Sequence, residues 1–86
     1  MSEKKLSEAE VKSVIALFSN GEYQQAIDEI AILSKNFPKS HMLHNIKGAC
    51  YAGLGQLDSA VKSYEKAIII KPDYAKAHFN LGGALH

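Results

Sequence analysis

The chain has 86 residues, of which 47% are hydrophobic and 22% are charged, and this composition excludes a disordered or a collagen-like chain. Ten lysines stand against nine acidic residues, so the formal net charge of +1 offers no electrostatic footprint for nucleic acid or for an anionic membrane. The length allows one domain, which buries about 60–65% of the surface that its unfolded chain exposes.

The compartment follows from the cysteine count and from the first residues of the chain. The single Cys50 has no partner for an intramolecular disulfide, which favours a reducing environment. The N-terminal flanking segment, residues 1–6, is polar and lacks the apolar core of a secretion signal. The longest aliphatic run, residues 67–70, is too short to span a bilayer. We therefore expect a cytoplasmic protein that has neither a membrane nor a nucleic acid as partner.

Residues 7–40 are predicted to form a first pair of helices. Apolar residues between Val11 and Phe18 recur at helical spacing up to a turn with the sequence SNGE, and a second apolar stripe then continues until Pro38. Ser7 and Glu10 have the spacing of a capping box at the start of the first helix.

Residues 41–74 repeat this organisation. Ser40 follows a proline and is the predicted N-cap of a helix that ends in the sequence GLGQ. A second apolar stripe begins at Leu57 and ends before Pro72. The two stripes predict a second helix pair.

A further helix is predicted in residues 75–86, with Asp73 as its N-cap. Nothing in the chain has the alternating period of a strand. The predicted class is therefore all-α.

A period of 34 residues relates these segments to one another. The matches fall on residues with a structural meaning, because they are turn glycines, small residues at helix crossings and prolines that end a unit. The pairs are Pro38 with Pro72, Gly21 with Gly55, Ala26 with Ala60, His44 with His78, and Gly48 with Gly82.

Residues 41–74 resemble a tetratricopeptide repeat, residues 7–40 resemble a divergent copy, and residues 75–86 resemble the first helix of a third copy. The resemblance implies a short right-handed α-solenoid of antiparallel helix pairs, with two repeats and one additional helix that serves as a capping or inter-chain helix. The residues of the second unit that carry it are Gly48, Tyr51, Gly55, Leu57, Ala60, Tyr64, Ala67 and Pro72.

Histidine and cysteine are the candidates for metal binding or catalysis. His44 and His78 occupy equivalent places in successive units, but no cysteine or carboxylate stands at a spacing that completes a tetrahedral site. Cys50 falls on an apolar stripe, where we expect a buried and unreactive thiol. The sequence therefore predicts no catalytic residue, no metal, no cofactor and no enzymatic activity.

The resemblance implies that the first helix of each unit lines a concave face. Family members that hold an acidic C-terminal peptide use Lys, Asn and Arg on this face, but here Val11, Ile15 and Ile46 stand at places of that set. An apolar face suits a peptide or a partner helix, so the implied function is a protein–protein interaction module; for Val11, Ile15 and Ala49, intramolecular packing is the competing assignment. The predicted partner-binding residues are Val11, Ile15, Phe18, Met42, Asn45, Ala49, Lys76 and Phe79.

Two alternative functions remain open at this point. The last helix exposes an apolar face that suits a homodimer or helix exchange between chains, and its predicted self-association residues are Ala77, Leu81, Ala84 and Leu85. Alternatively, the chain is the recognition arm of a larger enzyme whose catalytic residues lie outside these 86 residues.

Overall fold

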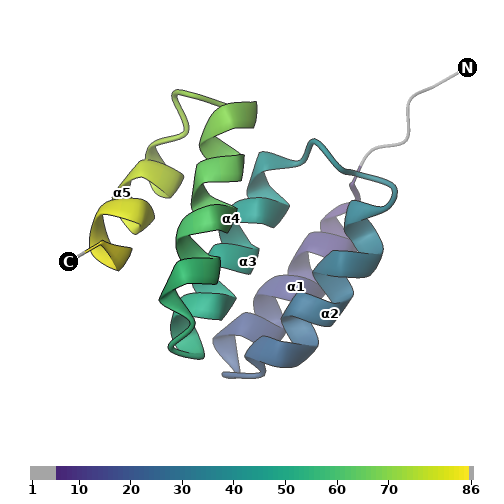
Figure 1. Cartoon of the computed structure of the whole chain (residues 1–86). Coiled ribbons are helices and arrows are strands. Elements are labelled where there is room, and N and C mark those ends of the chain that lie inside the picture. The colour runs from purple at the N-terminus through teal and green to yellow at the C-terminus, as the bar shows by residue number, and fades with distance from the viewer. Residues whose placement is uncertain (1–5, 86) are drawn as a thin grey trace, which may run out of the picture.

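The computed structural model describes residues 6–85, which form five α-helices and no strand (Figure 1). The predicted all-α class is confirmed. Residues 1–5 of the N-terminal segment and residue 86 lie outside the described residues. The helices are α1 (Glu8–Ser19), α2 (Tyr23–Ser34), α3 (His41–Gly53), α4 (Leu57–Ile70) and α5 (Ala75–Ala84).

The capping residues read from the sequence start two of the helices. Ser7 Oγ accepts the backbone N–H of Glu10 at 3.1 Å, and Glu10 Oε1 accepts the backbone N–H of Ser7 at 3.0 Å, so the capping box of α1 is confirmed. Ser40 Oγ accepts the backbone N–H of Leu43 at 3.3 Å, which confirms the cap of α3.

The prediction that Asp73 caps α5 is wrong. The N-cap is Tyr74, whose side chain makes no capping hydrogen bond. The backbone N–H of Tyr74 bonds to the Lys71 carbonyl at 3.0 Å, and this turn delays the start of the helix to Ala75.

The same kind of turn joins the two helices of each pair. Gly21 and Gly55 both have a φ of +77°, a left-handed conformation that favours glycine. In each turn the glycine N–H bonds to a carbonyl three residues back, on Phe18 and Ala52 respectively. The period of 34 residues therefore corresponds to a repeated backbone geometry.

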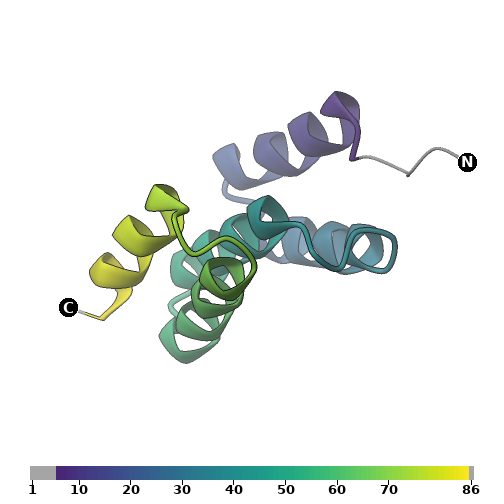
Figure 2. The same ribbon diagram turned by 90° about the horizontal axis from the view of Figure 1, so that it is seen from above.

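The helices stack into an elongated shape with principal extents of 45 × 28 × 17 Å. Viewed from above, α1 and α5 stand on either side of α3 (Figure 2). Helices α2 and α4 lie on the opposite side of α3. This arrangement leaves a concave side that is bounded by α1 and α5 and floored by α3.

The core is assembled from small clusters between neighbouring helices. One cluster joins Val14 of α1, Ile30 and Leu33 of α2 and Leu43 of α3. A second cluster places Cys50 against α2. Fully buried alanines, among them Ala60, Ala67 and Ala77, accompany these clusters in α2, α4 and α5.

Two glycines of α3 accept tyrosine rings from the neighbouring helices. A Cβ added to Gly48 would lie 2.5 Å from Cε1 of Tyr64 in α4. A Cβ added to Gly53 would lie 2.6 Å from Cε2 of Tyr23 in α2. Both distances are shorter than a carbon–carbon contact of about 3.5–4.0 Å, so a Cβ at either place would displace the ring above it.

Substitution of Gly48 by alanine tests this packing against a matched control. We expect Gly48→Ala to lower the free energy of unfolding by about 1–2 kcal/mol, because the Tyr64 ring is buried and must shift. Gly82 occupies the equivalent place in α5, where an added Cβ meets nothing within 4 Å. Gly82→Ala should leave stability unchanged or raise it by up to about 1 kcal/mol. Urea unfolding compares the two, and equal stability of both variants would contradict the proposed role of Gly48.

Candidate functional site

A hollow of about 480 Å³ opens on the concave side of the molecule. We call it the groove. Its floor comes from α3, one wall comes from the C-terminal half of α1, and the other comes from the start of α5. The lining residues are Ile15, Phe18, Ser19, His41, Met42, Asn45, Ile46, Ala49, Tyr74 and Lys76.

Six of the eight predicted partner-binding residues line the groove, namely Ile15, Phe18, Met42, Asn45, Ala49 and Lys76. Val11 lies beside it, in a neighbouring hollow of about 320 Å³ that it shares with Met42. Phe79 does not line the groove and is 82% exposed. It follows Lys76 by three residues on α5, so the two side chains project from the same side of that helix.

Intramolecular packing was the competing assignment for Val11, Ile15 and Ala49, but none of the three is fully buried. Ile15 is 43% exposed, and Val11 and Ala49 are half-buried. By contrast, Val14, one residue before Ile15, is fully buried in the core. These three residues therefore retain surface that a ligand can contact.

The sequence reasoning did not assign His41 and Tyr74 to the groove. Their rings meet edge to face, with centroids 4.6 Å apart, at the end of the groove near the start of α5. The period contained no signal for this pair, because Ser40 is the equivalent of Tyr74 in the preceding unit.

A carboxamide pair ties α5 to the groove floor. Asn80 donates a hydrogen bond from Nδ2 to Oδ1 of Asn45 at 3.0 Å, and Asn45 is only 7% exposed. The bond occupies the Asn45 carbonyl oxygen. The amide nitrogen is then the part of Asn45 left to contact a ligand.

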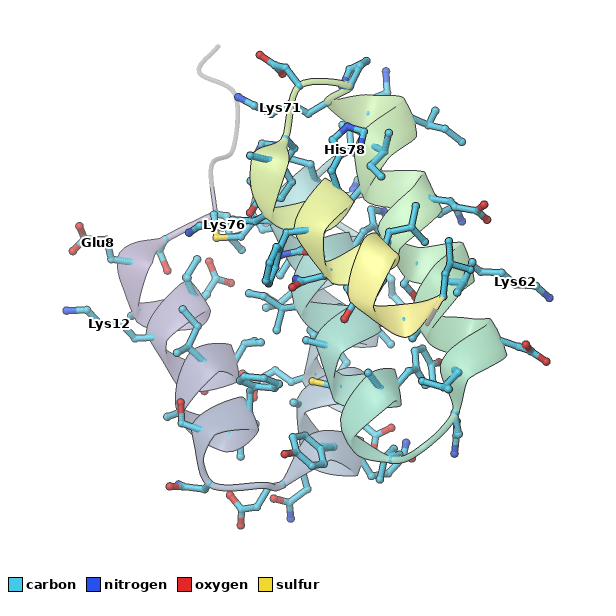
Figure 3. The ribbon with its side chains drawn as sticks, turned by 90° about the vertical axis from the view of Figure 1, so that its left-hand side faces the viewer. Glu8, Lys12, Lys62, Lys71, Lys76 and His78 are labelled. Carbon is cyan, nitrogen blue, oxygen red and sulfur yellow. The ribbon has the colours of Figure 1, made fainter. Side chains whose placement is uncertain are left out.

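Lys76 is the one charged residue that lines the groove within the described part of the chain. Figure 3 shows Lys76 on the side of α5 that faces Glu8 and Lys12 of α1. A negative group held in the groove would therefore meet a single ammonium group at the α5 wall.

The two repeat-equivalent histidines make the same contact. Nε2 of His44 lies 3.1 Å from the Pro38 carbonyl oxygen, and Nε2 of His78 lies 2.6 Å from that of Pro72. Because a carbonyl only accepts, each Nε2 carries the proton and donates it. Each histidine thus links a helix to the proline that ends the preceding unit.

His44 and His78 differ in their surroundings. His78 is exposed, whereas His44 is 7% exposed and its Nδ1 is buried without a hydrogen-bond partner. Burial lowers the pKa of His44 below its ordinary value of 6.5. The hydrogen bond to Pro38 opposes this shift, and the charges of Lys66 and Lys47 add to it.

The other candidates for reactive chemistry are the thiol of Cys50 and a metal site. Cys50 is fully buried, and burial raises the pKa of its thiol to about 11, so the thiolate nucleophile is scarce at neutral pH. Within residues 6–85 no three His, Cys, Asp or Glu side chains gather closely enough to hold a metal ion.

One residue of the predicted self-association set does not lie on the outer side of α5. Ala77 is fully buried, because it faces the neighbouring helices rather than the outside, so it cannot contribute to an exposed face. Leu81 and Ala84 are half-buried, and Leu85 is 66% exposed. Leu81 also lines a hollow of about 530 Å³ with Ile68 and Ile69 of α4.

None of the helices described in residues 6–85 has the length and apolar character needed to cross a membrane.

Comparison with known proteins locates similarity over most of the chain. Residues 48–86 match the model of the TPR repeat. The chain is 35% identical to a heat shock protein sti1 homolog of Schizosaccharomyces pombe over 83% of its length, and 34% identical to anaphase-promoting complex subunit 3 of Dictyostelium discoideum over 74%. It is 27% identical to a peroxisomal targeting signal receptor of Candida glabrata over 78% of its length. The chain spans 12%, 7% and 11% of these relatives, respectively.

The pKa of His44 predicts a pH dependence of stability. Because this pKa is lowered in the folded protein, the unfolded chain binds the proton at a higher pH, and the fold loses stability as the pH falls below about 6.5. We expect His44→Gln to flatten the profile of the free energy of unfolding between neutral and mildly acidic pH, measured in a phosphate-free buffer. His78→Gln removes the equivalent hydrogen bond to Pro72 and is the control for the loss of that contact. Identical slopes for wild type and His44→Gln would contradict the assignment.

Proposed function

Since the chain carries repeats of the tetratricopeptide family, we propose that it is a protein-interaction module that holds a peptide or a partner helix in the groove, with no catalysis of its own. The observation that carries the proposal is the groove itself, an apolar hollow of about 480 Å³ built by α1, α3 and α5. Its volume lies within the range of 300–1,000 Å³ that is typical of ligand sites.

The lining predicts the chemistry of the ligand. Ile15, Phe18 and Met42 provide an apolar surface for one or two buried side chains of the partner. Asn45 adds an amide donor on the floor, and Lys76 adds a positive charge on the α5 wall. The favoured ligand is therefore a segment with an apolar anchor, flanked by a carbonyl or an acidic group.

The groove differs from the family's site for acidic C-terminal peptides. Val11, Ile15 and Ile46 stand where the resemblance implies polar or cationic side chains, so the apolar contribution dominates here. We infer that the partner is selected by apolar burial more than by charge.

The proposal also includes the possibility that the chain is part of a larger polypeptide. The chain spans small fractions of relatives whose names describe a heat shock protein, a complex subunit and a targeting receptor. The module can therefore serve as the recognition arm of a larger polypeptide, including an enzyme. The single buried cysteine supports a reducing compartment such as the cytoplasm.

Self-association is a second candidate function, supported by the outer side of α5. An added Cβ at Gly82 or Gly83 would meet nothing within 4 Å, whereas the equivalent Gly48 is covered by a tyrosine ring. Ile69 is 78% exposed and Leu85 is 66% exposed, so the apolar surface continues onto α4. A second copy of the chain that packs its own α5 here would bury this surface.

Selection from a displayed library of random peptides tests the groove. Peptides that bind the wild type should lose affinity at least about tenfold on Ala49→Arg, which fills the floor, and should weaken on Phe79→Ala. Ala31→Arg places the same charge on an exposed position of α2 and should leave binding unchanged. Selected peptides that bind the Ala49→Arg variant as tightly as the wild type would place the site elsewhere.

Sedimentation equilibrium over a wide range of protein concentration tests self-association. If α5 pairs with a second copy, Leu85→Lys should weaken the dimer at least about tenfold, because it places a charge in the apolar contact. Ile32 on α2 is 64% exposed, close to the 66% of Leu85, so Ile32→Lys is the matched control. A monomer at every concentration would rule out this function.

A further inference from the structure

A second hollow, of about 200 Å³, lies between α3 and α4. Its α3 residues project from the side of that helix opposite to the groove floor, because positions 44, 47 and 51 fall across the helix from 42, 45 and 49. Figure 3 shows Lys62 extending away from the side on which Glu8, Lys12 and Lys76 lie. We call it the lysine hollow, and it is lined by His44, Lys47, Tyr51, Ser59, Lys62, Ser63 and Lys66.

The lysine hollow carries an uncompensated positive charge. Three of its lining residues are lysines and none is acidic. Lys47 and Lys66 lie close enough to His44 to lower its pKa. Among the described residues none of the three ammonium groups forms an ion pair with a carboxylate. Three like charges around one small hollow repel one another, and a bound anion would relieve that repulsion.

The lysines are not required by the packing of the repeat. One period earlier, the places of Lys47, Lys62 and Lys66 hold Ser13, Asp28 and Ile32 in a helix pair that folds in the same way. The positive charge is therefore a property of this helix pair alone and does not follow from the architecture.

A buried histidine, which can respond to the charge of a bound anion, forms part of the same hollow. His44 lines the lysine hollow, is 7% exposed, and leaves Nδ1 without a hydrogen-bond partner, while its Nε2 is held by Pro38. An unpaired polar atom at such depth is unfavourable, and Nδ1 is enclosed, so an anion in the hollow acts on the imidazole through its charge rather than through a direct hydrogen bond to Nδ1. The Ser63 hydroxyl donates to the Ser59 carbonyl at 3.0 Å, so its oxygen lone pairs are left as acceptors.

We propose that the lysine hollow binds a phosphoryl group, as inorganic phosphate or as a phosphorylated side chain of a partner. Three ammonium groups more than offset the two negative charges of a phosphate dianion, and the hydroxyls of Tyr51 and Ser59 add donors. His44 lies at the wall of the hollow, where the negative charge of a bound phosphate acts on the imidazole ring. A phosphorylated side chain loses its second proton near pH 6, so it is largely a dianion at neutral pH.

Phosphate binding should reverse the direction in which the protein shifts the pKa of His44. Without the anion, the groups that face His44 are Lys47 and Tyr51 of α3, Lys62 and Lys66 of α4, and the Pro38 carbonyl before α3. The cations among them disfavour a charged imidazole. A phosphate in the hollow offsets their charge, so the pKa of His44 should be higher with phosphate bound than without it.

The test is a titration of the whole chain with sodium phosphate, followed by NMR at constant ionic strength with sodium chloride as the reference. We expect saturable shifts of the amides around Lys47, Lys62 and Ser63, with a Kd of roughly a few millimolar, and an upward shift of the His44 pKa. The Lys62→Gln/Lys66→Gln double variant should weaken binding at least about tenfold. Lys12→Gln/Lys35→Gln removes the same charge elsewhere and should bind like the wild type.

Two further comparisons identify the ligand and separate this proposal from that of the groove. A phosphoserine peptide that binds more tightly than inorganic phosphate identifies a phosphorylated partner, and tighter binding of inorganic phosphate identifies the free ion; both support the site. Equal shifts with chloride, or equal affinity of the Lys62→Gln/Lys66→Gln and Lys12→Gln/Lys35→Gln variants, would overturn it. Ala49→Arg should leave phosphate binding unchanged, so failure at the groove and failure at the lysine hollow are distinguishable.

Discussion

The close approach of α3 to its two neighbours is the constraint on which the rest of the structure depends. Gly48 lies under the ring of Tyr64 from α4, and Gly53 lies under the ring of Tyr23 from α2. A methyl group at either place would overlap the ring, so the two glycines set how near the helices come. Helix α3 is thereby held against both neighbours, and two hollows open along the rest of its length.

The two hollows beside α3 are chemically different. One carries Met42, Asn45 and Ala49, which floor the groove between α1 and α5. The other carries His44 and Lys47, which face α4 across the lysine hollow. One helix therefore separates an apolar surface suited to a peptide from a cationic surface suited to an anion, and a ligand on one surface need not disturb the other. The hydrogen bond from Asn80 to Asn45 fixes α5 to the same helix.

Local chemistry accounts for the features that were predicted correctly. The capping box at Ser7, the cap at Ser40 and the turn glycines are each read from a few adjacent residues, because their hydrogen bonds are made within one turn of the chain. The prediction for Asp73 failed because a backbone turn after Pro72 delays the start of α5, and side-chain preference did not reveal that turn. Ala77 was assigned to an exposed face, although it is packed inside.

The sequence by itself determined five helices, their order and most residues of the groove, because the apolar spacing and the 34-residue period are local properties that every unit repeats. Only the tertiary structure decided what breaks that repetition. It brought His41 against Tyr74, left Nδ1 of His44 buried without a partner, and gathered three lysines of α3 and α4 around one hollow. Such contacts depend on the distance and rotation between helices, which are set by the packing of rings on glycines rather than by the spacing of residues along the chain.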